Sequence, residues 1–247
     1  MRWGVWAGDA RALLFSRRAA YSIIIMAMLA LLVAIIVRYS PEGLKSALEA
    51  AAPGSSGVFE YLWMEDVLDK LLLLIFISFG SFVICDLEDD RMTAFVYSRS
   101  MSRSEQLLGR LTGSLASFLL VFMVGSLIVA AIGAVIVGEL DAPVFVLHQI
   151  MVLPMCLFVF SLTFFLSVPL RTTAPTVMTS FGISLALSFA YSFLLMGGDT
   201  APSELNPLAL GYRILVGLPL EYAAGIALVI SIVLIGGGFF WFTRKDI

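Results

Sequence analysis

Side chains that can catalyse a reaction or bind a metal are few in this sequence, and they are not spaced for either task. His148 is the only histidine, which excludes an HExxH zinc motif and favours a hydrogen-bonded structural residue. Cys85 and Cys156 lack CxxC spacing and lie in or beside apolar runs, as expected of small buried side chains. The sequence has no glycine-rich loop ending in Lys-Ser or Lys-Thr. We therefore expect neither an enzyme nor a chain that binds a cofactor itself.

The largest group of charged side chains lies between residues 86 and 110, here called the charged segment. Its acidic cluster comprises Asp86, Glu88, Asp89 and Asp90, and its arginines are Arg91, Arg99, Arg103 and Arg110. Such a segment is typical of a solvated loop, and it can also dock a soluble partner. The longest Lys/Arg run of the chain is Arg17-Arg18 and the net charge is -3, so no nucleic-acid binding is expected.

A second set of polar side chains repeats at every fourth residue inside an apolar stretch. This hydroxyl ridge comprises Thr176, Ser180, Ser184, Ser188 and Ser192. Small hydroxyl residues at this spacing let helices approach closely and can hydrogen-bond across the contact. Three interpretations stay open: packing within the chain, a subunit interface, or the wall of a translocation path.

These residues are carried by a very apolar chain. Of its 247 residues 60% are hydrophobic and 13% charged, and the mean hydropathy is +1.01. Backbone polar groups cannot stay unpaired in hydrocarbon, so each run of about 20 apolar residues predicts a spanning helix. Six runs qualify, at residues 20–37, 67–85, 111–137, 144–168, 176–196 and 223–242. The predicted fold is all-α, a single polytopic membrane domain with six transmembrane helices.

Three stretches outside these runs have a recognisable character. Residues 1–19 carry Trp3, Trp6 and further apolar residues at three- and four-residue spacing, which predicts an interfacial helix. The glycine- and serine-rich stretch 50–57 predicts a mobile, turn-rich linker. In segment 197–222, prolines separate pieces too short to cross a bilayer, so we expect short re-entrant or interfacial helices on the external side.

The basic residues predict the orientation. With the N-terminus inside, the cytoplasmic segments hold four Lys or Arg before residue 20, four between 91 and 110, and Arg171, Arg244 and Lys245. The opposite side holds the remaining Lys and Arg residues and most of the acidic residues. Both termini are therefore predicted to be cytoplasmic. Asp69 and Lys70 fall at the outer end of the second run, which leaves essentially no ionisable residue at membrane depth. This argues against an ion-coupled transporter or a proton pump.

The order of short motifs in the charged segment resembles the signature loop of type-2 ABC exporter permeases. The matching residues are Ser98-Arg99-Ser100-Met101-Ser102-Arg103 and Leu107-Leu108-Gly109-Arg110, after an acidic cluster. Departures are Ser100 in place of a proline, Arg91-Met92 where Gly-Thr is usual, and Arg110 in place of a lysine. The register of the acidic cluster is therefore open by about one residue.

Two further matches lie near the end of the chain. Leu205-Asn206-Pro207 with Tyr212-Arg213 resembles elements of the permeases of the nitrous-oxide-reductase maturation subgroup. The final residues, from Phe242 to Ile247, resemble the family's aromatic and basic ending. Each motif is weak alone, whereas their order along the whole chain is specific.

The resemblance implies a half-transporter in a prokaryotic inner membrane. An N-terminal elbow helix and a cytoplasmic coupling helix would accompany the six spans. Arg99, Ser100, Met101, Ser102 and Arg103 would dock a separate ATP-binding-cassette ATPase subunit, which would bind ATP and Mg. A second permease chain, identical or paralogous, would complete the transporter among membrane lipids, and apolar, hydroxyl-lined spans would suit an amphipathic cargo. The alternatives are a membrane assembly or mechanotransmission protein without cargo, and an ion-coupled secondary transporter.

Overall fold

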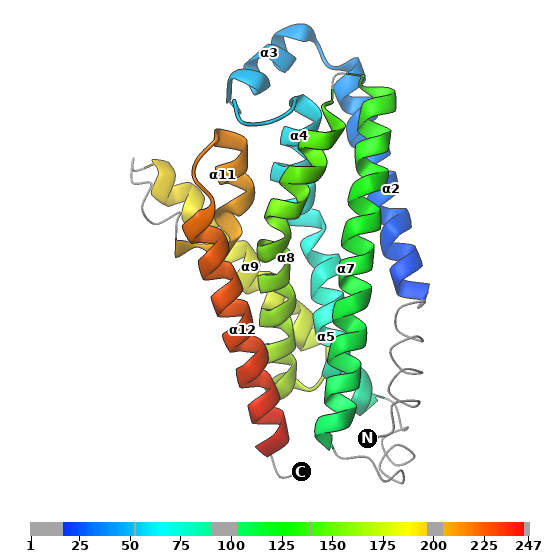
Figure 1. The fold of residues 1–247 in the computed structure, drawn as a ribbon, viewed down its shortest axis with the longest axis vertical. Helices are drawn as coiled ribbons and strands as arrows, with labels where there is room; N and C mark the ends of the chain where they lie inside the picture. The colour runs from blue at the N-terminus through cyan, green and yellow to red at the C-terminus, as the bar shows by residue number, and fades with distance from the viewer. Residues whose placement is uncertain (1–16, 52, 90–102, 139, 197–204, 245–247) are drawn as a thin grey trace.

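Six helices long and apolar enough to cross a bilayer run along the long axis of the molecule (Figure 1). In this computed structural model they are α2 (Arg17–Tyr39), the compound helix Val58–Cys85, α7 (Arg103–Ile136), α8 (Ala142–Leu170), α9 (Thr173–Met196) and α12 (Glu221–Arg244). The compound helix consists of α4 (Val58–Leu62), the π-helix η1 (Trp63–Leu71) and most of α5 (Leu73–Asp89). The predicted all-α, six-span fold is confirmed.

The structure describes residues 17–51, 53–89, 103–138, 140–196 and 205–244, with the side chains of 51, 86–89, 103 and 191–196 left undefined. No strand occurs within these ranges. The predicted interfacial helix 1–19 lies almost wholly outside them. Three shorter helices complete the described chain: α3 (Glu42–Ala51), η2 (Pro207–Ala209) and α11 (Leu210–Val216).

The core is built around α8, which packs against α5, α9 and α12, while α2 packs mainly on α7. From Val152 to Leu170 no residue of α8 is exposed, as expected of a helix that is apolar on every side. Aromatic rings join three helices here: Phe118 of α7 lies 5.5 Å, between ring centroids, from both Phe76 of α5 and Phe160 of α8. By contrast, α2 and α12 keep exposed apolar faces that suit contact with lipid.

Two spanning helices approach each other closely at Gly80. A Cβ atom at this position would lie 2.5 Å from the carbonyl oxygen of Phe160 and 2.8 Å from the Cβ of Thr163, both in α8. Small residues permit such backbone contact in membranes, where van der Waals packing is a main force between helices. Gly80 therefore fixes α5 tightly against α8.

The second span begins at Val58 rather than at the predicted Val67. Glu60, Glu65 and Asp66 interrupt the apolar run in the sequence, and they concealed the helical continuation on its N-terminal side. The structure buries Glu60 completely, so this acidic residue lies inside the helix bundle and not in an external loop.

The turn-rich character predicted for residues 50–57 is confirmed at residues 53–57, which form turns and bends. The Gly54 backbone N–H donates to the Leu215 carbonyl oxygen at 2.9 Å, and a Cβ at Gly54 would lie 2.7 Å from the backbone nitrogen of Gly217. This stretch is thus fitted onto α11, which is the short apolar helix expected in segment 197–222.

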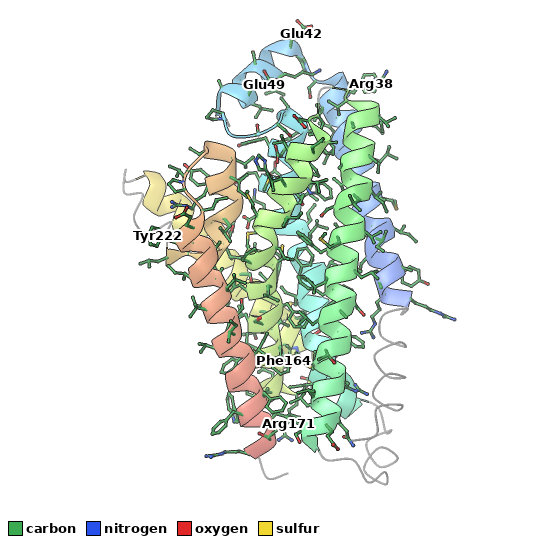
Figure 2. The ribbon with its side chains drawn as sticks, viewed as in Figure 1. Arg38, Glu42, Glu49, Phe164, Arg171 and Tyr222 are labelled. Carbon is green, nitrogen blue, oxygen red and sulfur yellow. The ribbon has the colours of Figure 1, made fainter. Side chains whose placement is uncertain are left out.

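Figure 2 places Arg171 near one end of the bundle and Arg38, Glu42 and Glu49 at the other. We call these the Arg171 end and the Arg38 end. Three spanning helices lie between Arg38 and Arg171 in the chain, and an odd number of crossings brings the two residues to opposite ends. Which end faces the cytoplasm stays a prediction.

Candidate functional site

The charged segment connects two long helices. Asp86, Glu88 and Asp89 form the last turn of α5, and Arg103 begins α7. Asp90 and the predicted docking residues Arg99, Ser100, Met101 and Ser102 lie outside the described residues. Gly109 is buried in the second turn of α7 and Arg110 is half-buried beside it. The structure therefore describes the two helices that would carry the docking residues.

Those two helices are joined to each other inside the bundle. Ser114 of α7 donates its hydroxyl to the carbonyl oxygen of Phe79 in α5 at 2.6 Å, in a buried contact. The Phe76 and Phe118 rings meet edge to face one turn away. At the Arg171 end, the Arg18 guanidinium lies over the Phe82 ring and connects the start of α2 to α5.

The hydroxyl ridge faces the interior of its own chain. Thr176, Ser180, Ser184 and Ser188 are all buried, and α9 packs against α5 and α8. The Thr176 hydroxyl lies 3.5 Å from the Cys85 thiol, and Ser188 donates to Asp69. Their burial within the chain favours packing, whereas the subunit interface and the wall of a translocation path stay predictions. The side chain of Ser192 is undefined.

Asp69 is a buried carboxyl inside the second span. Only 5% of the residue is exposed, and its Oδ2 accepts a hydrogen bond from the Ser188 hydroxyl across the η1–α9 contact. Because the span starts at Val58, Asp69 is an interior residue and not the outer end of the helix. The sequence had placed Asp69 at the outer end of the second run, whereas the structure buries it among the spanning helices.

A second buried carboxyl, that of Glu60, lies nearer the Arg38 end. Its Oε1 lies 2.8 Å from His148 Nδ1 in α8, and its other oxygen accepts the Ser56 backbone N–H. Glu60 has no exposed surface, whereas the His148 side chain is 16% exposed. The expectation that His148 is a hydrogen-bonded structural residue is confirmed, and its partner is a residue that the sequence had placed in a loop.

Between these carboxyls lie buried polar groups with no partner. Among the residues that the structure describes, nothing hydrogen-bonds to Trp63 Nε1, to either polar atom of the Gln149 amide, or to Asp69 Oδ1. Gln149, Cys156 and Thr163 are spaced seven residues apart and share one face of α8. That face is directed at the second span, since Thr163 borders Gly80 and Cys156 lies within range of the Asp69 charge.

The segment that holds Asp69 is a π-helix. The Leu72 backbone N–H bonds the Val67 carbonyl oxygen at 2.8 Å, five residues earlier. Such turns are rare in proteins and are frequent at functional sites. The sequence signal for this site was weak: a Gln in the fourth apolar run at seven-residue spacing from Cys156, and an Asp just inside the second run.

The two motifs matched before the last span have structural partners. The Asn206 side chain donates to the Leu187 carbonyl oxygen of α9 at 2.8 Å and accepts from the Leu208 backbone N–H at 3.0 Å. Arg213, only 3% exposed, donates from Nε to the Pro219 carbonyl oxygen at 2.8 Å. These residues fasten η2 and α11 to the bundle.

Neither a metal centre nor a known relative identifies the site. Within the described ranges, no three His, Cys, Asp or Glu side chains come together in a way that could hold a metal ion. No protein-family model matches the chain, and no curated protein matches it.

Proposed function

We propose that this chain is the membrane-spanning subunit of an ATP-binding-cassette exporter. A separate ATPase subunit binds ATP and Mg and docks on the charged segment through Arg99 and Arg103. Support comes from the order of motifs in that segment and from the six-span bundle that carries it. The observation on which the proposal mainly rests is the geometry of α7.

The helix α7 is much longer than a membrane requires. Its 34 residues run without a break from Arg103 to Ile136, which is about 51 Å at about 1.5 Å per residue. The hydrocarbon core is about 30 Å thick. A straight helix therefore continues about 20 Å beyond it, shared between the two ends, and a push applied at Arg103 travels along one rigid element.

The contacts inside the bundle transmit such a push. Ser114 and Phe118 connect α7 to α5, and Phe118 also meets Phe160 of α8. Since α9 and α12 pack on α8, a displacement at the charged segment reaches every helix of the core. A second permease chain, identical or paralogous, completes the transporter, and the exposed apolar faces of α2 and α12 leave room for that chain or for lipid.

The test is charge reversal at the docking residues. We expect the double variant Arg99→Glu/Arg103→Glu to lose co-purification with the ATPase encoded in the neighbouring reading frame, and to lose stimulation of its ATP hydrolysis. Lys45→Glu in α3 is the matched control, because it reverses a charge at the opposite end of the bundle. Equal recovery of the ATPase with both variants contradicts the docking proposal.

A further inference from the structure

Asp69 is a carboxyl buried in the membrane-spanning part of the bundle with one oxygen unused. Oδ2 accepts the Ser188 hydroxyl, whereas Oδ1 has no hydrogen-bond partner among the described residues. Buried polar atoms in native proteins nearly always have partners, so this oxygen is a position where a water, a ligand or a proton can bind.

The depth of Asp69 follows from its contact with α9. Ser188 comes 15 residues after Thr173, the first residue of α9 at the Arg171 end. At about 1.5 Å per residue this is about 22 Å along the helix, against a hydrocarbon core about 30 Å thick. Asp69 thus lies in the third of the membrane nearer the Arg38 end. Ionisable residues within membrane-spanning segments are rare, and they mark places where a ligand, an ion or a proton binds.

A column of buried polar groups continues from Asp69 toward the Arg38 end. Gln149 lies about 10 Å above Cys156 on the face of α8 that Thr163 directs at the second span. Gln149 is the next residue after His148, and the His148 ring is hydrogen-bonded to Glu60. Trp63 lies one turn after Glu60 in the second span. We call this set the outer polar column. It ends at His148, the member whose side chain is partly exposed.

The charged and titratable groups around Asp69 lie on η1 itself and on the elements packed near it, of which α4 contributes Glu60 and the half-buried Tyr61. On η1 itself, Glu65 is half-buried and Asp66 pairs with Lys70 at 2.9 Å on the exposed side. From α8 come Cys156 and, one level higher, His148. Helix α11 contributes Arg213, which donates to the Pro219 carbonyl oxygen. Helix α9 contributes the Ser188 hydroxyl. Residues 19–37 of α2 hold no charge. No described Lys, Arg or His forms an ion pair with Asp69.

A single carboxylate with hydroxyl and amide neighbours suits a proton better than a metal ion. A monovalent or divalent cation needs several oxygen ligands, and no cluster of three acidic or other metal-binding side chains is present in the described ranges. A proton needs only one free carboxylate oxygen, which Asp69 Oδ1 supplies.

We propose that Asp69 is an exchangeable proton-binding site in the membrane-spanning bundle, connected to the Arg38 end by the outer polar column. A proton taken up at that end binds Oδ1 and cancels the carboxylate charge. The Ser188 hydroxyl then donates to a neutral acid instead of a carboxylate, and a charge-assisted hydrogen bond is about twice as strong as a neutral one. Proton occupancy therefore changes how firmly η1 is held against α9.

This site goes beyond the proposed exporter function and does not depend on it. ATP hydrolysis on a partner subunit does not require a proton site in the membrane. The experiment therefore uses the full chain alone in lipid vesicles, without an ATPase, so that its failure leaves the docking proposal untouched.

Infrared spectroscopy of the carboxyl C=O stretch measures the site directly. As the pH of the medium rises, we expect one protonated-carboxyl band to disappear. The band is lost in Asp69→Asn and kept in Glu42→Gln, which removes an exposed carboxyl of α3. Ser188→Ala retains Asp69 and must shift the frequency of the same band, which keeps the test decisive if Asp69→Asn does not fold.

The column is tested by the rate of proton exchange. After a pH jump, we expect the Asp69 band to respond at least several-fold more slowly in Glu60→Gln than in the wild type, with the same end point. Absence of the band at every pH at which the protein stays folded, a band that does not change with pH, or an identical band in Asp69→Asn overturns the proposal. An unchanged rate in Glu60→Gln overturns the route.

Discussion

Replacing Gly80 by alanine tests how tightly α5 is held against α8. The added Cβ would lie 2.5 Å from the Phe160 carbonyl oxygen and 2.8 Å from the Thr163 Cβ. Comfortable contacts are about 3.5–4 Å, so one helix must move by about 1 Å. Neither neighbour is the flexible end of a side chain, so neither can rotate away.

The expected cost follows from overpacking. Extra carbon atoms in a well-packed core cost about 1–3 kcal/mol, which is about a 5- to 140-fold change in the unfolding equilibrium at about 1.4 kcal/mol per tenfold. Reversible unfolding in mixed detergent micelles, followed by helical circular dichroism, measures this change. Gly80→Ala should be less stable than the wild type by that amount.

The matched control is Gly182→Ala in α9. A Cβ there meets nothing within 4 Å, and alanine favours the helix over glycine by up to about 1 kcal/mol. This variant should be as stable as the wild type or slightly more stable. Equal destabilisation by the two substitutions would falsify the inference that Gly80 is a site of backbone contact.

Three further predictions concern single polar contacts, all read out as unfolding free energy. Glu60→Ala should destabilise the protein by about 1–3 kcal/mol, because His148 loses a buried partner. The control, Glu42→Ala at an exposed position, should change the stability by no more than about 0.5 kcal/mol. Similar effects at both positions would show that the burial of Glu60 does not stabilise the fold. Ser114→Ala should cost about 0.6 kcal/mol and at most about 1.7, the range of hydrogen bonds between membrane helices, and no loss at all argues against the α5–α7 bond. Asn206→Ala should lower the stability by about 1 kcal/mol, because residues 205–216 lose their connection to α9. Amide hydrogen exchange in these residues should increase. Unchanged exchange would contradict that connection.

The spans were predictable because length and hydropathy are local properties. Residues 20–37 and 223–242 each lie within one observed helix, and the structure extends those helices by only a few residues. Apolar length alone imposes a helix in hydrocarbon, whatever lies beside it. The long α7 extends further, to Arg103, because charged and polar residues beyond the bilayer continue the same helix.

The candidate site could not be predicted because it depends on contacts between residues far apart in the sequence. The burial of Glu60 depends on His148, 88 residues later in the sequence, and no local pattern signals that pairing. The hydroxyl ridge was visible as a four-residue period, yet its role depended on which surface covers it. The position of α5 against α9 favours packing within the chain.

The enclosure of α8 from Val152 to Leu170 has a consequence for any assembly of two such chains. A stretch without exposed residues offers little surface to lipid or to a second copy. The peripheral helices offer partners more surface, and changes in bilayer thickness or composition act on those helices first. The enclosed half of α8 then provides a fixed axis about which the outer helices rearrange.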